Sequence, residues 1–345
     1  MLNIPKVSVI IPIYNVEKYI RQCLESVISQ TLKDIEILCI DDCSTDTSIK
    51  IVESFLKKDN RIKILQLNNN KLPGIARNIG IQNSIGTYIS FIDPDDYVKP
   101  DFLEVAYTKL EELQLNSVWF NIKIFDDTKK SFTKDNYFLK SDNGPLIVTS
   151  KNINIFPINC WNKVYRLSTI KENNIIFSEN ILFEDLEFYY RFFTQSKEIY
   201  FINKHLYIYR LRPNSILSSK KNRNDIFKAI KNIYNYLNKK NIFEDYKESF
   251  IQLIIQSIER SPNIKDMVPY IVDLLKQINF PKDYTRTDKN NFYDFLNYII
   301  YFNKLSKTMQ TLNKYYFGLI FGISKFLPKK SYRKKCREKF KKYIF

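Results

Sequence analysis

The first 125 residues alternate between short apolar runs and segments whose apolar residues recur every three or four positions. Such runs predict buried strands, and such spacing predicts amphipathic helices. We expect strands near 7–11, 35–40, 62–67, 88–92 and 118–125, and helices near 17–29, 49–56, 74–84 and 101–113. Strands that alternate with helices form a sheet covered on both faces. The sequence therefore predicts a Rossmann-like α/β fold with a mixed, mostly parallel sheet.

The remaining chain is expected to divide near residue 221. Residues 126–159 are polar and predict an irregular connection. A helix near 183–194 and short strands at 200–201 and 206–209 complete a first domain, 1–221. Residues 222–345 predict a helical C-terminal extension. Its expected helices lie near 225–238, 244–259, 266–278 and 290–317.

Charge is unevenly distributed along the chain. Residues 1–221 carry 29 Lys/Arg against 26 Asp/Glu, whereas residues 222–345 carry 25 against 11. The last 17 residues hold nine Lys/Arg and one Glu, interleaved with aromatic residues. Such a segment predicts contact with an anionic lipid surface, a nucleic acid or an acidic partner. We favour the membrane surface, and a solvated helix is the alternative.

Cysteine spacing and hydropathy predict the compartment in which we expect the chain to lie. Its five cysteines are scattered, which favours reduced thiols over disulfides or a zinc site. No apolar run reaches the roughly 20 residues that cross a bilayer, and no secretory leader is visible. We therefore expect a cytoplasmic protein, peripheral on the inner face of the cytoplasmic membrane.

Two acidic clusters follow apolar runs, Asp41-Asp42 after residues 35–40 and Asp93-Pro94-Asp95-Asp96 after residues 88–92. Parallel sheets bind ligands beyond the carboxyl ends of their strands. Mg²⁺ takes one or two carboxylates plus substrate phosphates, so Asp95, together with Asp93, is a candidate metal ligand. Helix capping is the alternative explanation. The six glycines form neither a G-x-G-x-x-G nor a P-loop pattern, so a bound diphosphate would need a cation.

Several segments in order resemble the inverting family 2 nucleotide-sugar glycosyltransferases, which share the A-type glycosyltransferase fold. The resemblance covers roughly residues 5–218. It rests on residues 9–15 (VIIPIYN), 26–31 (SVISQT), 40–46 (IDDCSTD), 74–80 (GIARNIG), 91–96 (FIDPDD), 161–165 (WNKVY), 183–185 (FED) and 209–215 (YRLRPNS). The family's usual glycine after the acidic pair is Cys43 here.

The resemblance implies roles for individual residues. The nucleoside pocket would be lined by Pro12, Tyr14, Asn15 and Asp42. Of the other nucleotide-binding residues, Arg77 would lie near the base or diphosphate, and Asp93 would face the ribose or the metal. Asp95 would be the main ligand of Mg²⁺ or Mn²⁺, and Arg210 or Arg212 would steady the departing diphosphate. Asp185 would be the general base. Glu184 and Trp161 would lie on the acceptor or sugar side, although Trp161 is equally compatible with core packing.

The chemistry of sugar transfer makes the same demands on these residues. A departing diphosphate needs positive charge, and an attacking hydroxyl needs a base within hydrogen-bond reach. Asp185 is expected to begin a helix, where the macrodipole favours a charged carboxylate. Ordinary acid enrichment in a first helical turn is the alternative for Glu184-Asp185.

We therefore interpret the chain as a metal-dependent inverting glycosyltransferase. It would use a UDP-sugar and a hydroxyl of a bacterial surface glycan, such as lipooligosaccharide, capsule or a lipid-linked glycan. A nucleic-acid-binding protein acting through its basic end is one alternative, although paired carboxylates repel phosphate and we expect no nucleic acid partner. A sugar-nucleotide-binding module without catalysis is the other.

Overall fold

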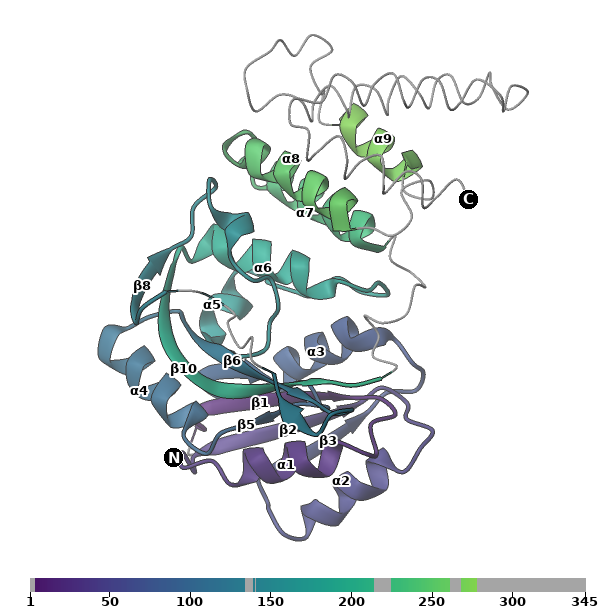
Figure 1. The fold of residues 1–345 in the computed structure, drawn as a ribbon, viewed down its shortest axis with the longest axis vertical. Coiled ribbons are helices and arrows are strands. Elements are labelled where there is room, and N and C mark those ends of the chain that lie inside the picture. The colour runs from purple at the N-terminus through teal and green to yellow at the C-terminus, as the bar shows by residue number, and fades with distance from the viewer. Residues whose placement is uncertain (1–3, 134–138, 140, 214–224, 261–267, 278–345) are drawn as a thin grey trace, which may run out of the picture. The chain divides into compact units, whose positions relative to one another are not determined.

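The computed structural model describes residues 4–133, 139, 141–213, 225–260 and 268–277 (Figure 1). The chain divides into two compact units, Met1–Leu253 and Ile254–Phe345. Residues 222–253 thus belong to the same unit as the predicted catalytic domain. The predicted helix near 290–317 and the basic end of the chain lie outside the described residues.

Within the described residues of the first unit, ten strands form one mixed sheet in the order β3-β2-β1-β4-β9-β6-β10-β5, with β7 beside β6 and β8 beside β10. The strands are β1 (Val7–Ile13), β2 (Ile35–Asp41), β3 (Ile62–Gln66), β4 (Tyr88–Phe91), β5 (Tyr97–Val98), β6 (Ser117–Asp126), β7 (Ser131–Phe132), β8 (Gly144–Ile147), β9 (Lys163–Arg166) and β10 (Glu198–Leu211). β1 to β4 are mutually parallel and β10 is parallel to β6, whereas β5, β7, β8 and β9 pair antiparallel. The predicted Rossmann-like mixed sheet is confirmed.

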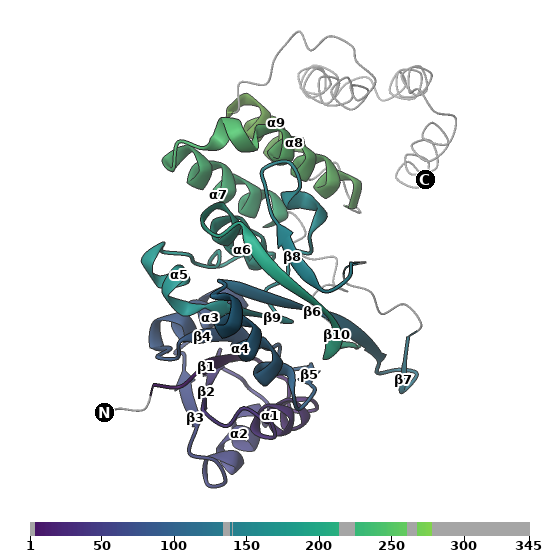
Figure 2. The same ribbon diagram turned by 90° about the vertical axis from the view of Figure 1, so that its left-hand side faces the viewer.

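Helices cover both faces of this sheet (Figures 1 and 2). The helices of the first unit are α1 (Ile20–Ile28), α2 (Ser48–Leu56), α3 (Leu72–Asn83), α4 (Phe102–Leu113), α5 (Leu167–Glu172), α6 (Glu184–Gln195), α7 (Asp225–Lys239) and most of α8 (Phe243–Arg260). The described part of the second unit contains the end of α8 and α9 (Val268–Gln277). α1, α2 and α4 share one buried cluster with alternate residues of β1 and β2, while α3 packs on the opposite face of these strands. α6 packs against α3, α5 and α7.

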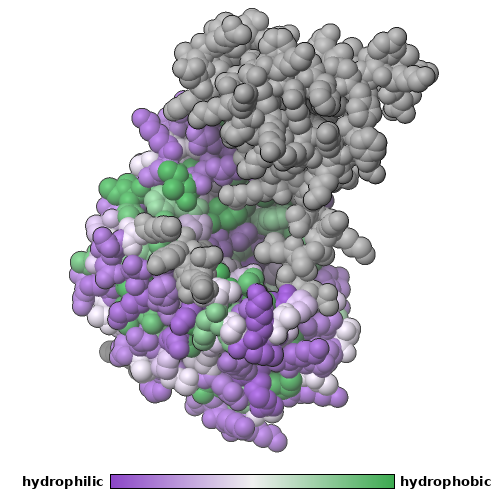
Figure 3. Space-filling view, in the orientation of Figure 1, coloured by the Kyte–Doolittle hydropathy of each residue, from purple (hydrophilic) through white to green (hydrophobic). Residues whose placement is uncertain are grey.

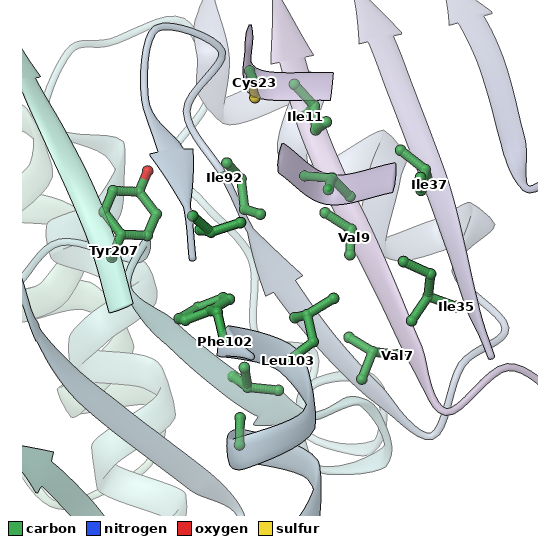
Figure 4. Packing of buried hydrophobic residues seen from close by; sticks show 14 of the residues in the cluster. Val7, Val9, Ile11, Cys23, Ile35, Ile37, Ile92, Phe102, Leu103 and Tyr207 are labelled. Atoms are coloured by element: carbon green, nitrogen blue, oxygen red, sulfur yellow. The ribbon is translucent and has the colours of Figure 1, made fainter. Parts of the chain in front are cut away.

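The alternation of side chains along β1 explains the two layers. Val7, Val9 and Ile11 point into the cluster with α1 and α4 (Figure 4), and all three are fully buried. Burying such a side chain stabilises the fold by about 1.5–3 kcal/mol. Ile10 faces α3, where a Cβ on Gly80 would come within 2.6 Å of it. Glycine at this position lets α3 lie directly on the sheet.

The structure corrects three sequence-based expectations. The first helix begins at Ile20, not at residue 17. The connection 126–159 is not wholly irregular, because it contains β7, β8 and a short 3₁₀ helix, Ile153–Ile155. The two short strands expected at 200–201 and 206–209 are one strand, β10, whose register against β6 shifts around His205. The bulged register interrupts the period-two pattern, so the sequence looked like two strands.

Hydrophilic residues dominate the face of the first unit seen in Figure 3, and hydrophobic residues lie there in small groups. In the part of the chain that the structure describes, no helix combines the length and apolar character that a membrane span needs.

Candidate active site

The ends of three neighbouring strands define the candidate site. β2 and β4 flank β1, so the segments that follow these parallel strands emerge at the same edge of the sheet. Ile13 at the end of β1 lies opposite Asp41 at the end of β2. The backbone N–H of Ile92, which follows β4, donates to the backbone carbonyl oxygen of Ile10 in β1. The two acidic clusters, about fifty residues apart in sequence, therefore lie on either side of the turn after β1. Chain order reverses between β1 and β4, which is where such sheets bind ligands.

The residues expected around the nucleoside shape two loops at this edge. Asn15 has a left-handed backbone, φ 50°, and its Oδ1 accepts from the backbone N–H groups of Thr45 at 2.8 Å and Asp46 at 3.3 Å. Asp42 is buried and its Oδ1 accepts from the Lys71 N–H at 2.7 Å. Burial raises the pKa of Asp42. Both side chains thus hold loops in place.

Tyr14 and Pro12 differ in their exposure. The Tyr14 side chain is 45% exposed at the edge of the sheet, so it is accessible to a ligand. Pro12 is buried inside β1, where it pairs with Ile40 of β2. Pro12 therefore contributes to the sheet that underlies the site.

Arg77 connects the acidic strand end to the helix that carries the expected base. It comes from α3 and is 5% exposed. Its Nη2 lies 2.8 Å from Asp93 Oδ1, and its Nη1 pairs with the Glu184 carboxylate at the start of α6. Its buried Nε has no hydrogen-bond partner within the described residues. A buried N–H without a protein partner is costly, and a water or a ligand can satisfy it.

Of the two candidate phosphate-binding arginines, Arg212 is the one with an exchangeable partner. Arg212 Nε lies 2.5 Å from Asp95 Oδ2, and both side chains are about one-fifth exposed, 19% each. Arg210 is buried, and it donates to the Asp95 backbone oxygen at 2.7 Å, Asp127 at 3.0 Å and Gln22 at 2.5 Å. Arg210 therefore ties together three segments, whereas Arg212 pairs with a carboxylate that is open to solvent.

The third aspartate of this cluster, Asp96, is a structural residue that the sequence did not separate from its neighbours. It is 1% exposed and accepts from the Tyr207 hydroxyl and the Arg210 N–H, both at 2.8 Å. Burial, with the negative charge of Asp95 beside it, raises its pKa strongly. Asp96 thus fixes β10 to the turn that presents Asp95. Its signal in the sequence was only its place in an acidic run.

The donor set suits a divalent cation only if the substrate completes the coordination. No group of three or more His, Cys, Asp or Glu side chains in the described ranges could surround a metal ion. The side chains of Asp93 and Asp95 are 22% and 19% exposed, and each carboxylate is paired with an arginine, Arg77 and Arg212 respectively. Mg²⁺ commonly binds through one or two carboxylates with phosphate oxygens and waters, so Asp95 fits such an ion.

The carboxyl group of Asp185 is protonated more readily than an ordinary aspartate. Burial is the main cause and the charge of Glu184 the next, and together they raise its pKa to about 7. Burial therefore opposes the charged form that a position at the start of a helix favours. A carboxylate with a pKa near 7 accepts a proton more strongly than one near 4, as a general base requires.

Lys163 is a residue near this site to which the sequence assigned no role. It is fully buried on β9, and its ammonium group donates to the backbone oxygens of Pro157 and Asn159. It also lies 4.2 Å from the ring centre of Trp119. Burial lowers its pKa to about 7, and attraction to Asp185 opposes this shift. Its only signal was its place in the segment Trp161-Asn162-Lys163.

Trp161 packs on one side against aromatic residues of β10. Its ring stacks on Tyr207 at 4.9 Å and on Tyr209 at 5.1 Å, with interplanar angles of 24° and 12°. Trp161 is only partly buried. Both roles considered for it, core packing and a platform for a sugar, are compatible with this geometry.

The comparisons with known proteins agree with this architecture. The family model "Glycosyl transferase family 2" matches residues 8–173. Glycosyltransferase GlyA of Streptococcus pneumoniae is 35% identical over 225 residues, which are 63% of this chain and 32% of that protein. The chain thus spans about a third of GlyA. Glycosyltransferase GlyG of the same organism is 32% identical over 224 residues, 61% of this chain and 72% of that protein.

Among solved structures, the fold is similar to the crystal structure of S. aureus TarS 1-349 in complex with UDP-GlcNAc. The TM-score is 0.67 at 24% identity, over 80% of this chain and 82% of that one. At this identity the likeness concerns the fold. Taken with the family match and with GlyG, it leads to one conclusion: the chain belongs to glycosyltransferase family 2.

Proposed function

We propose that this protein is an inverting, metal-dependent glycosyltransferase that moves a sugar from a UDP-sugar to a hydroxyl of a bacterial surface glycan. The proposed acceptors are lipooligosaccharide, capsule and lipid-linked glycans. The observation that carries the proposal is the ion-pair chain from Asp93 through Arg77 to Glu184. It joins the acidic strand end, suited to a donor diphosphate, to the helix that carries a candidate base. The UDP-GlcNAc bound to TarS, a protein of similar fold, supports a UDP-sugar donor.

In this proposal the described residues have separate tasks. Asp185 accepts the proton of the attacking hydroxyl, and its raised pKa makes it a stronger base. Arg212 leaves Asp95 and donates to the diphosphate, so the charge of the leaving group is stabilised as it develops. Asp95 would hold a Mg²⁺ or Mn²⁺ ion, which would supply further positive charge to the leaving group. Attack from the side opposite the diphosphate inverts the anomeric centre.

Two substitutions separate donor binding from proton transfer. Asp185→Asn should lower kcat by about 10²–10⁴-fold and leave the affinity for Mn²⁺-UDP unchanged, because it removes only the base. Asp95→Asn should weaken Mn²⁺-UDP binding as well. Turnover is measured as UDP release across a panel of UDP-sugars with a lipid-linked glycan acceptor, and affinity by calorimetry.

The matched control is Glu112→Gln, at an exposed position of α4, which should behave as the wild type. UDP binding without turnover on any donor would instead favour a binding module. If Asp185→Asn and Asp95→Asn both turn over at the wild-type rate, the assignment of the site is wrong.

A further inference from the structure

The backbone immediately before the candidate base is in an uncommon conformation. Phe183, the residue before α6, has φ 65°, in the left-handed region that crowds a side chain's Cβ. Glu184 and Asp185 follow directly, so this turn sets the direction in which α6 starts. Strained backbone of this kind persists only where the surrounding structure holds it.

Part of that support comes from α3. Asn78 Nδ2 donates to the Phe177 carbonyl at 3.0 Å, and Asn78 Oδ1 accepts from the Phe177 N–H at 2.8 Å. Arg77 on the same helix pairs with Glu184. These contacts hold the beginning of segment 177–184 and the first residue of α6, and the middle of the turn needs another partner.

That partner is Asp225, the first residue of α7. Its Oδ2 accepts from the Leu182 N–H at 3.1 Å, and the whole residue is 6% exposed. Its Oδ1 lies 2.8 Å from Lys228 Nζ. A carboxylate buried in this way is costly unless it is paired, and a backbone N–H must find an acceptor. Asp225 satisfies both requirements at the residue next to the left-handed turn.

A second contact fixes the same helix further along. Asn232 of α7 donates from Nδ2 to Glu187 Oε2 at 3.0 Å, and Ser178 also donates to this carboxylate. Arg191 binds the other oxygen of Glu187 at 2.6 Å. α7 therefore contacts the turn before α6, at Leu182, and the first turn of α6, at Glu187. These two contacts lie on either side of Asp185 in the sequence.

From these contacts we propose that Asp225 is a positioning residue for the reaction, because it holds the turn Leu182-Phe183 that orients Asp185. The inference rests on the proposed role of Asp185 as the base. α7 follows the part of the sequence that carries the family motifs. The inference therefore gives this helix a role in catalysis that no motif indicates.

The first part of the test is a hydrogen-exchange measurement, which needs no sugar-nucleotide donor. Hydrogen exchange of the full chain should be faster by about tenfold in peptides covering 180–187 of Asp225→Ala, and unchanged in α1 and α2, because only the local bond is lost. Asp225→Asn keeps an oxygen acceptor, so hydrogen exchange in the same peptides should be accelerated less. Asn235→Ala, at an exposed position of α7, is the matched control and should not differ from the wild type.

The second part separates positioning from general stability. Asp225→Ala should lower kcat by about ten- to a hundredfold with unchanged Mn²⁺-UDP affinity, since small misplacements of a catalytic group are costly. Asp225→Asn should recover most of the rate. If Asp225→Ala does not fold, Asp225→Asn carries the test, with exchange and kcat both changed by at least about twofold.

Unchanged exchange at 180–187, or a uniform rise along the chain, overturns the inference even if no donor is found. Faster local exchange with a wild-type kcat also overturns it, and leaves the proposed function standing. A failure of the proposed function looks different, because the wild type then releases no UDP from any donor.

Discussion

At the scale of single residues, the ionisation of Asp185 sets the pH dependence of the proposed reaction. Its pKa of about 7 means that the base is mostly protonated in mild acid. We expect kcat/KM to rise about tenfold per pH unit below pH 7 and to level off above it. A pH profile of UDP release checks this, and a profile flat between pH 5 and 8 would contradict it.

The same raised pKa predicts an effect on stability that needs no substrate. The unfolded chain has an ordinary aspartate pKa of about 4 at this position, so between pH 4 and 7 the folded state binds more protons. Stability should therefore fall as pH rises through that window. Asp185→Asn, which cannot ionise, should melt higher than the wild type at pH 8 and close to it at pH 4. Equal melting differences at both values would argue against the shift.

Cys43 offers a second test at this scale. Its φ is 65°, a conformation in which a Cβ costs about 1–2 kcal/mol. Cys43→Gly removes that strain but adds freedom to the unfolded chain, so we expect a net gain of about 0.5–1 kcal/mol in urea unfolding. Cys43→Ala keeps the Cβ and should gain nothing. Equal stability of the two variants would mean that the turn is not strained.

At the scale of elements, the close approach of α3 to the segment before α6 positions the site. A Cβ on Gly74 would lie 2.1 Å from the Ser178 carbonyl oxygen and 3.0 Å from Glu184 Cβ. Because the first of these is backbone, Gly74→Ala must push α3 and segment 178–184 apart. We expect a loss of about 2–3 kcal/mol of stability and a fall in kcat, measured by urea unfolding and UDP release.

Gln82→Ala, on an exposed position of the same helix, is the control and should change the unfolding free energy by less than about 0.5 kcal/mol. Gly74→Ala with wild-type stability would show that the two segments are not held together. This contact joins residues more than a hundred positions apart.

The elements also mark what the sequence can and cannot predict. Strands such as β1 and β2 were predictable because runs of β-branched residues on both faces of a buried strand are distinctive. The edge that gathers Asn15, Asp42 and Asp95 followed from the parallel order alone. Pairings such as Arg212 with Asp95, or Asp225 with Leu182, depend on tertiary packing, which no local pattern records.

At the scale of the whole molecule, the excess of basic residues lies in the C-terminal third of the chain. Residues 1–221 are nearly neutral, whereas residues 222–345 carry 25 Lys/Arg against 11 Asp/Glu. An excess of Lys and Arg in one part of a chain strengthens its binding to anionic surfaces, but it does not determine the fold. A lipid-linked acceptor would lie at such a surface, so the charge would bring the proposed active site to its substrate.

We therefore expect the full chain to sediment with vesicles containing phosphatidylglycerol, weakly with neutral vesicles, and less as salt increases. Each basic residue near the surface contributes about 1 kcal/mol, so changing Lys334, Lys335 and Lys339 to Gln should weaken vesicle binding by at least about tenfold. The same number of changes in the first unit, at exposed Lys18, Lys57 and Lys58, is the control and should have little effect. Salt-sensitive binding to single-stranded RNA with no vesicle binding would assign the basic end to nucleic acid instead.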